Sequence, residues 1–280
     1  MSQKCWVRFA QLALRVAEQS LPGYAHKFSP QRYRLAQLAG CVCLKQYLRL
    51  DWRGIEQLLQ LSPPLRQALG LRDVPDHTTL CRFAARWLTA PTLGGLLARL
   101  LVCCGLRQVD VAVDSTGLEA DTASLYFATR RGTHRRQAYP KLSISVVIGA
   151  LVAVSAVADW GACNDKTELP QLLTETMQRV RVGQLYADAG YDAEWVHQVC
   201  RGAGIGSWIP PVKHRADGKV GGHWRAQMAR GLPPHYGRRW AVESFISGLK
   251  RVVGAHLQAR QPQRQLEETL LKAVVYSIHR

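Results

Sequence analysis

The sequence has few acidic residues and lacks the patterns of membrane and secreted proteins. It has 20 Asp and Glu against 37 Lys and Arg. Its longest uncharged stretch, residues 142–158, is shorter than the ~20 apolar residues of a spanning helix and contains three serines. Residues 1–16 lack the long apolar core of a signal peptide. These absences predict a protein without a membrane segment.

Metal-binding patterns built on cysteine or histidine are also missing. The eight cysteines form no C-x-x-C pair, and the nine histidines form no H-x-x-x-H or H-E-x-x-H arrangement. Several cysteines lie in apolar runs such as LLVCCGL, where free cysteine behaves as a small hydrophobic residue. We therefore expect reduced thiols in a cytosolic protein and no zinc site.

The excess of positive charge is large and uneven. The formal net charge is +17 and the pI is near 10.0. Residues 1–105 carry a net +9 and residues 236–280 a net +5, whereas residues 106–235 carry only +3 because 12 carboxylates lie there. Such an excess indicates a polyanionic partner, most often nucleic acid. A generally basic surface is the less specific alternative.

The hydrophobic pattern changes once along the chain, near residue 106. Residues 1–105 have helical periodicity, including a helix that begins after Asp76, a suitable N-cap. Beyond them the pattern predicts a strand at VDVAVD, a hairpin over residues 142–158, and then alternating helices and strands. The predicted fold is α/β, a mixed sheet with helices, preceded by an all-helical N-terminal domain.

Two regions of the second domain, residues 106–280, depart from this alternation of helices and strands. Residues 212–235, rich in Gly, Lys, Arg, His and Pro, predict a basic mobile loop or short insertion. Residues 266–280 predict a terminal helix. Because the sequence stops at this helix, a missing C-terminal tail is an open alternative. From about Tyr236 a further helix is predicted to run to about Gly254.

That helix carries four chemically distinctive side chains on one face. At 100° per residue, Tyr236, Arg239, Glu243 and Lys250 fall within a sector of about 60°. An acid among a phenol, a guanidinium and an ammonium suits the handling of phosphate. A solvated face with an i,i+4 pair between Arg239 and Glu243 is the simpler alternative, which charge alone does not exclude.

The spacing Y-x2-R-x3-E-x6-K resembles the signature of bacterial insertion-sequence transposases of the DDE class. VAVDSTGL around Asp114 and LYADAGYD around Asp188 are similar to that family's two aspartate motifs, and GACNDKTELPQLL resembles the segment between them. Asp114 and Asp188 are 74 residues apart, and Glu243 follows 55 residues later. PDHTTLCRF in the first domain is more loosely similar to a helix-turn-helix-like stretch near the N-termini of the family.

The resemblance implies a ribonuclease-H-like catalytic domain in which Asp114, Asp188 and Glu243 are both catalytic residues and metal ligands. It implies two Mg²⁺ ions, with Mn²⁺ as a substitute, because hard cations prefer carboxylate oxygen. The implied reaction is hydrolysis of phosphodiester bonds at the element ends, followed by transfer of the freed 3′-hydroxyl into target DNA. Double-stranded DNA would be the partner, and a homodimer would join two ends.

The remaining candidate residues would contact DNA. Tyr236, Arg239 and Lys250 would grip phosphates near the scissile bond. A basic cluster is predicted to contact the DNA backbone: Arg130, Arg131, Arg135, Arg136 and Lys141. One face of a helix is predicted to read DNA: His77, Thr78, Thr79 and Arg82. A solvated loop and an ordinary core helix are the respective alternatives.

Three other aspartates compete with the favoured ones. Asp110 shares the strand face of Asp114 but lies further from the strand end, which favours a structural role. Asp192 and Asp165 each precede a predicted helix, so both are interpreted as N-caps, with Asp165 also supporting the site indirectly.

Two alternative functions remain open. A decayed or domesticated copy would bind DNA without cutting it, and a structure-selective nuclease would use the same fold. In each case we expect a cytoplasmic, nucleoid-associated bacterial protein.

Overall fold

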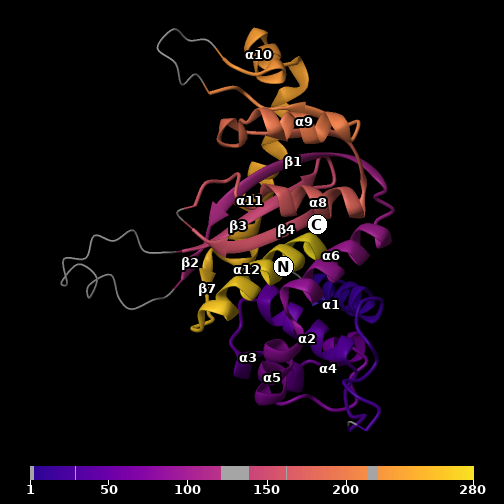
Figure 1. Cartoon of the computed structure of the whole chain (residues 1–280). Helices are drawn as coiled ribbons and strands as arrows, with labels where there is room; N and C mark the ends of the chain where they lie inside the picture. The colour runs from indigo at the N-terminus through magenta and orange to yellow at the C-terminus, as the bar shows by residue number, and fades with distance from the viewer. Residues whose placement is uncertain (1–2, 29, 121–138, 162, 213–219) are drawn as a thin grey trace, which may run out of the picture. The chain divides into compact units, whose positions relative to one another are not determined.

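The computed structural model describes residues 3–28, 30–120, 139–161, 163–212 and 220–280, and the chain divides into two compact units (Figure 1). The first unit comprises Met1–Cys104, Ala120–Thr122 and Leu249–Arg280, and the second comprises Gly105–Glu119 and Ala123–Gly248. The C-terminal segment therefore groups with the N-terminal helices, whereas the division drawn from the sequence assigned residues 266–280 to the second domain.

The first unit is helical, as the periodicity of residues 1–105 predicts. Its helices are α1 (Gln3–Glu18), α2 (Leu35–Tyr47), α3 (Trp52–Leu61), α4 (Pro63–Ala68), α5 (His77–Trp87), α6 (Ala90–Cys103) and α12 (Pro262–His279). α1 packs on α2, and α12 packs on α2 and α6. The core contains the fully buried Leu44, Ile55 and Leu59. A short sheet of β2 (Glu119–Ala120) and β7 (His256–Leu257) is separate from the main sheet.

The start of α5 confirms the predicted N-cap. The Asp76 carboxylate accepts hydrogen bonds from the backbone N–H groups of Thr78 and Thr79, at 2.9 and 3.0 Å. Both threonine hydroxyls also donate to Asp76. Together these bonds, above all those from the two hydroxyls, hold the pKa of Asp76 well below its usual range. The first turn of α5 is thus stabilised by its own side chains.

Two cations cap the C-terminal end of α11 (Trp240–Val253), a helix whose residues belong to both units. The buried Lys272 ammonium donates to the backbone carbonyls of Val253 and Gly254, each at 2.9 Å. The Arg49 guanidinium donates to the carbonyl of Val252 at 2.9 Å. These carbonyls have no partner within the helix, and positive charge stabilises the negative end of the helix dipole.

The second unit contains a five-stranded mixed sheet of order β4-β3-β1-β5-β6. The strands are β1 (Gln108–Gly117), β3 (Pro140–Val147), β4 (Ala153–Trp160), β5 (Arg181–Ala187) and β6 (Gly206–Trp208). β3 and β4 form the predicted hairpin, and β3 is antiparallel to β1. Figure 1 shows α8 (Leu169–Arg179) beside the sheet, and it packs on β3, β4 and β5. α9 (Glu194–Gly202) packs on β6. The predicted α/β class with a mixed sheet is confirmed.

The pairing of β1 with β5 is parallel and positions the ends of both strands. Val113 pairs with Ala187, so the next residues, Asp114 and Asp188, follow at the same level of the sheet. Adjacent strands lie about 4.8 Å apart, which brings the backbones of these two aspartates close together.

The segment from residue 212 to 239 differs from its prediction. Residues 213–219 lie outside the described residues, but residues His223–Arg230 form a helix, α10, which replaces the predicted loop, while the alternative of a short insertion stays a prediction. Arg225 of α10 donates two hydrogen bonds to the buried Asp192 carboxylate, at 2.8 and 2.7 Å. Asp192 is therefore an ion-pair partner, and its interpretation as an N-cap is wrong, because Ala193 holds that position at α9.

The predicted helix from Tyr236 also begins differently. Residues Pro234–Arg239 form a 3₁₀ helix, η2, and the α-helix begins only at Trp240. Residues three apart nearly eclipse in a 3₁₀ helix, so Tyr236 and Arg239 still share a face. Among the described residues, no helix is both long and apolar enough to cross a membrane.

Lys272 predicts a specific pH dependence of stability. Burial lowers its pKa from 10.5 to about 8. Between these values the unfolded chain binds a proton that the folded chain has released, so this group makes the free energy of unfolding rise with pH, by up to ~1.4 kcal/mol per pH unit. Urea unfolding at pH 8 and pH 10 measures the rise, which we expect to be smaller in Lys272→Met.

Lys4→Met, a change at an exposed lysine of α1, is the control and should retain the wild-type pH dependence. An equal rise in Lys272→Met and wild type would contradict the assignment.

Candidate active site

Two carboxylates lie at the same level of the neighbouring strands β1 and β5 in the second unit. Asp114 is half-buried inside β1, which continues to Gly117 rather than ending at Asp114, and the Ser115 N–H donates to its Oδ1 at 2.8 Å. Asp188 follows β5 directly, and its Oδ1 accepts the N–H of Gly190 at 2.8 Å. That bond caps the short 3₁₀ helix η1 (Ala189–Tyr191), which holds the Asp188 carboxylate at the strand end.

The electrostatic environment of Asp114 is unusual for an aspartate. Burial, together with the negative charges of Asp188 and Asp165, raises its pKa from 3.8 to about 6. The Ser115 N–H and the positive charge of Arg239 oppose that rise. Carboxyl groups crowded in this way favour the binding of a cation or a proton, and such perturbed groups are frequent at functional sites.

The third predicted acid, Glu243, lies in the first turn of α11 and is 51% exposed. Its carboxylate forms an ion pair and a hydrogen bond with the guanidinium of Arg239, four residues earlier. This is the i,i+4 pairing that the sequence offered as the simpler alternative. Arg239 nevertheless acts on Asp114 as well, because its charge lowers the Asp114 pKa.

Tyr236 connects η2 to the strand that precedes Asp188. Its hydroxyl donates to the backbone carbonyl of Ala187 at 3.0 Å. Burial raises the pKa of Tyr236, with Asp188 and Glu243 adding to the rise and Arg239 opposing it. A phenol held this way fixes the position of η2, and therefore of Arg239, relative to the end of β5.

The basic residues predicted to contact DNA differ in their surroundings. Lys250 is half-buried on α11. Lys141 is buried on β3, where its ammonium lies 2.9 Å from Glu168 and 3.0 Å from Asp165, so it does not have the surface position that a backbone contact requires. The other four members of that cluster lie outside the described residues: Arg130, Arg131, Arg135 and Arg136.

The candidate DNA-reading residues of α5 also have partners within the first unit. His77 contacts the Glu56 carboxylate through its Nδ1 at 2.8 Å, and Thr78 and Thr79 bind Asp76. Arg82 is exposed, and the described residues provide no ion-pair partner for it. Of these four residues, Arg82 is the most available to an external partner.

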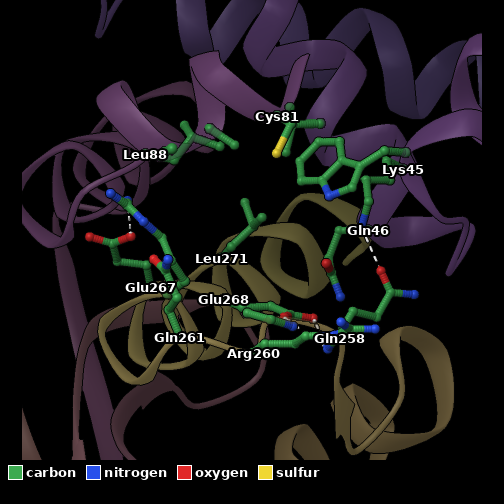
Figure 2. Close-up of a pocket in the computed structure, with 16 residues that line it drawn as sticks. Lys45, Gln46, Cys81, Leu88, Gln258, Arg260, Gln261, Glu267, Glu268 and Leu271 are labelled. Carbon is green, nitrogen blue, oxygen red and sulfur yellow. Dashed lines mark hydrogen bonds and ion pairs between the residues drawn. The ribbon is translucent and has the colours of Figure 1, made fainter. Parts of the chain in front are cut away.

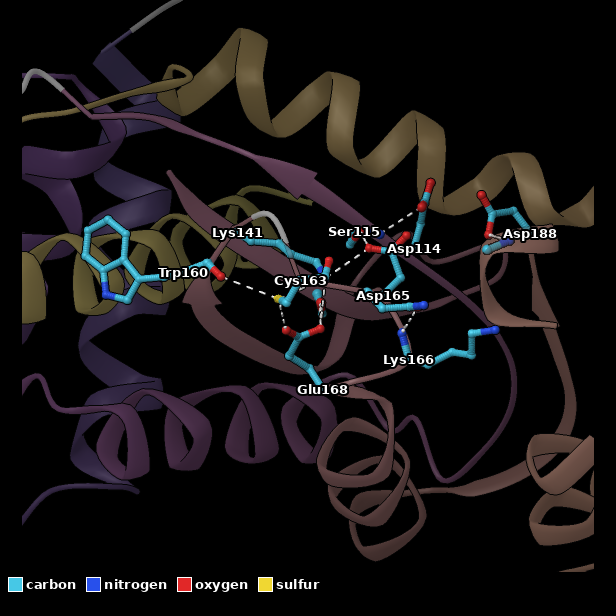
Figure 3. Close-up of polar contacts among 12 residues, drawn as sticks. Asp114, Ser115, Lys141, Trp160, Cys163, Asp165, Lys166, Glu168 and Asp188 are labelled. Atoms are coloured by element: carbon cyan, nitrogen blue, oxygen red, sulfur yellow. Dashed lines mark hydrogen bonds and ion pairs between the residues drawn. The ribbon is translucent and has the colours of Figure 1, made fainter. Parts of the chain in front are cut away.

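Sequence reasoning underrated Asp165. It is not the N-cap of α8, because Glu168 holds that position. Instead its Oδ1 accepts the Ser115 hydroxyl at 2.6 Å and pairs with Lys141 (Figure 3). Asp110, interpreted as structural, pairs with Arg238 at 3.3 Å. The position of Asp165 in the segment between the two aspartate motifs was the only available signal.

The donor set suits a hard divalent cation. Asp114 and Asp188 offer carboxylate oxygens, the ligands that Mg²⁺ prefers. The like-charge crowding at Asp114 would be relieved by a cation there. Within the described part of the chain, no three acidic, histidine or cysteine side chains are close enough to hold a metal ion, which agrees with Glu243 being held by Arg239.

A cavity of about 530 Å³ in the first unit is lined by residues of α2, α3, α5, α12 and the segment before α12 (Figure 2). The Lys45 ammonium there donates to the Gln258 side chain at 2.7 Å and lies 4.6 Å from the Trp52 ring centroid. Glu268 accepts backbone N–H groups of Gln258 and Ala259. Because these charges have internal partners and none of the candidate catalytic residues lines the cavity, it is not the candidate active site.

Comparison with known families adds an independent finding. Residues 106–278 match the family model described as "Transposase DDE domain". Residues 10–86 match a second model, described as "Transposase domain (DUF772)". A search of the curated proteins finds no match. The first match covers more than half of the chain and includes all three candidate carboxylates.

The interaction between the two aspartates is testable by NMR. Asp188→Asn removes one negative charge, so the pKa of Asp114 should fall from about 6, while burial keeps it above its usual value. Titration of ¹³C-labelled aspartate carboxyls, assigned with Asp114→Asn, measures the change.

Asp110→Asn removes the same charge from the same strand, four residues away, and should leave the Asp114 pKa nearly unchanged. An unaltered pKa in Asp188→Asn would show that the two carboxylates do not interact.

Proposed function

The chain belongs to the DDE transposase family, and from this membership we propose that it cuts DNA at the ends of an insertion sequence and joins the freed 3′-hydroxyl to target DNA. The observation that carries the proposal is the placement of Asp114 and Asp188 at the same level of two adjacent parallel strands. Both lie within the matched residues 106–278. Crowding of half-buried carboxylates destabilises the folded chain, and cations bound for phosphoryl transfer would offset that cost.

Asp114, Asp188 and Glu243 would hold two Mg²⁺ ions, or Mn²⁺ in their place. Bound divalent ions supply a more acidic water or hydroxyl and neutralise charge on the phosphate and the leaving oxygen. The residues of the chain contribute positioning: Ser115 and Gly190 orient the two aspartates through their N–H groups. Glu243 has to separate from Arg239 to join them, and an exposed i,i+4 pair costs little to break.

Arg239 and Lys250 would bind DNA phosphates beside the acids, and Tyr236 would support Arg239 through its bond to Ala187. A phosphate offers Arg239 a bidentate partner that replaces Glu243. DNA binding would therefore release the third carboxylate at the place where it is needed.

The first unit would bind the terminal repeats of the element, with a homodimer joining two ends. Two observations support DNA binding by the first unit. Residues 1–105 carry a formal net charge of +9, and residues 10–86 match a transposase domain. Arg82 on α5 is exposed, and the described residues provide no ion-pair partner for it, so it is available to bind DNA. Contacts of this kind with phosphates make affinity strongly dependent on salt.

Cleavage of labelled duplex DNA that carries the ends of the element tests the proposed function. In Mg²⁺ the wild-type protein should nick the element boundary, and Glu243→Gln should nick it more slowly by on the order of 10²-fold or more, because one cation ligand is lost. Glu175→Gln, a change on α8 at a half-buried pair with Arg179, is the control and should cut like wild type.

Binding without cleavage by the wild-type protein would favour a DNA-binding copy that has lost activity. Cleavage of branched or flapped DNA without preference for element ends would favour a structure-selective nuclease.

Arg239→Gln tests the phosphate contact separately from cleavage. Loss of one phosphate contact should reduce the slope of log K against log salt by about 1. Fluorescence anisotropy with end DNA at several salt concentrations measures that slope. Arg181→Gln, at the exposed opposite end of β5, should keep the wild-type slope. Equal slopes for all three proteins would exclude a phosphate contact by Arg239.

A further inference from the structure

Asp165 lies in the segment between β4 and α8, and its side chain contacts β1, the strand that carries Asp114. Its Oδ1 accepts the hydroxyl of Ser115, the residue next to Asp114, at 2.6 Å. The same oxygen pairs with the buried Lys141 ammonium at 3.0 Å. One oxygen of Asp165 is therefore fixed, and within the described residues its Oδ2 accepts no hydrogen bond.

The second oxygen of Asp165 faces Asp188 across Gly190. A methyl group added at Gly190 would meet Asp188 Oδ1 at 2.9 Å and Asp165 Oδ2 at 3.2 Å. Both carboxylates thus approach the same small volume, which only a residue without a side chain leaves open. The side chain of Asp165 is 37% exposed, so an ion from solvent can reach it.

A buried hydroxyl without a partner lies at the same place. Tyr191 is 1% exposed, and its Oη has no hydrogen-bond partner among the described residues. The charges of Asp165, Asp114 and Asp188 all act on this hydroxyl. A buried polar group is normally hydrogen-bonded, so the Tyr191 hydroxyl, which has no partner among the described residues, points to a ligand at this place.

A network of buried ion pairs and hydrogen bonds fixes the position of Asp165 through its Oδ1. Lys141 is shared between Asp165 and Glu168, and Glu168 also accepts the thiol of Cys163 at 2.9 Å (Figure 3). Lys141 pairs with Gly117 in the β1–β3 ladder, which fixes its backbone beside the catalytic strand. This network neutralises Glu168 and orients Asp165 while leaving Asp165 Oδ2 available.

We propose that Asp165 is a fourth acidic residue of the active site, which acts through its charge rather than as a further metal ligand and so helps Asp114 and Asp188 to bind divalent cations. It also acts as a positioning residue for Asp114, through the Ser115 hydroxyl. The inference rests on the proposed function, because it adds a residue to the same cation site. Removal of the charge should weaken cation binding even when the shape of the side chain is kept.

Mn²⁺ binding to the full chain without DNA, followed by the EPR signal of free Mn²⁺, tests the proposal without measuring cleavage. Asp165→Asn keeps the shape and an oxygen for Ser115 but removes the charge. We expect its Mn²⁺ affinity to fall roughly 5- to 10-fold, as for the loss of one nearby carboxylate. Asp165→Glu keeps the charge and should bind Mn²⁺ more tightly than Asp165→Asn.

Asp110→Asn is the matched control, because it removes an equally charged side chain from β1 at a position paired with Arg238. It should bind Mn²⁺ within about twofold of wild type. Circular dichroism and thermal unfolding verify that each variant folds.

The possible outcomes separate the two proposals. If Asp165→Asn binds Mn²⁺ like wild type while Asp114→Asn does not, Asp165 is not part of the site and the proposed function stands. If Asp165→Asn and Asp165→Glu lose affinity equally, Asp165 has only a structural role and the inference is overturned. If wild type binds no Mn²⁺ without DNA, the inference is overturned, and the cleavage experiment with DNA decides the proposed function by itself.

Discussion

The parallel register of β1 with β5 is the constraint on which the candidate site depends. Because Val113 pairs with Ala187, two aspartates that are 74 residues apart in the chain follow at the same level of the sheet. The pKa of Asp114 is raised first by burial and then by the neighbouring negative charge of Asp188, because like charges in a partly buried position repel each other. Folding therefore maintains an unfavourable arrangement that a cation would stabilise.

The groups around these carboxylates each limit that repulsion in a different way. Backbone N–H groups of Ser115 and Gly190 bind one oxygen of each aspartate. Arg239, the last residue of η2, lowers the pKa of Asp114 by its positive charge, and Lys141 pairs with the neighbouring Asp165. None of these cations replaces a metal ion, because each is already bound to another acid. The arrangement keeps acids close together without neutralising them completely.

The two units meet different physical requirements. The second unit needs a rigid sheet, because the neighbouring strands β1 and β5 have to hold the carboxylates of Asp114 and Asp188 in fixed positions. The first unit is a helical unit with a strong positive charge, which suits extended contact with a polyanion. α11 carries Glu243, and its last carbonyls are bound by Lys272 and Arg49. The C-terminal end of that helix is thus stabilised by cations of two other segments of the first unit.

The sequence by itself determined the helical first region, the mixed α/β second region, the N-cap at Asp76 and the family. These features depend on local periodicity, turn chemistry and residue spacing, which are properties of short segments. It did not determine the partners of Asp192, Lys141 or Asp165, because a buried ion pair joins segments far apart in the chain. Only the tertiary structure decided that Asp165 approaches Asp188 across Gly190, since that meeting depends on how β1, β5 and the segment before α8 pack together.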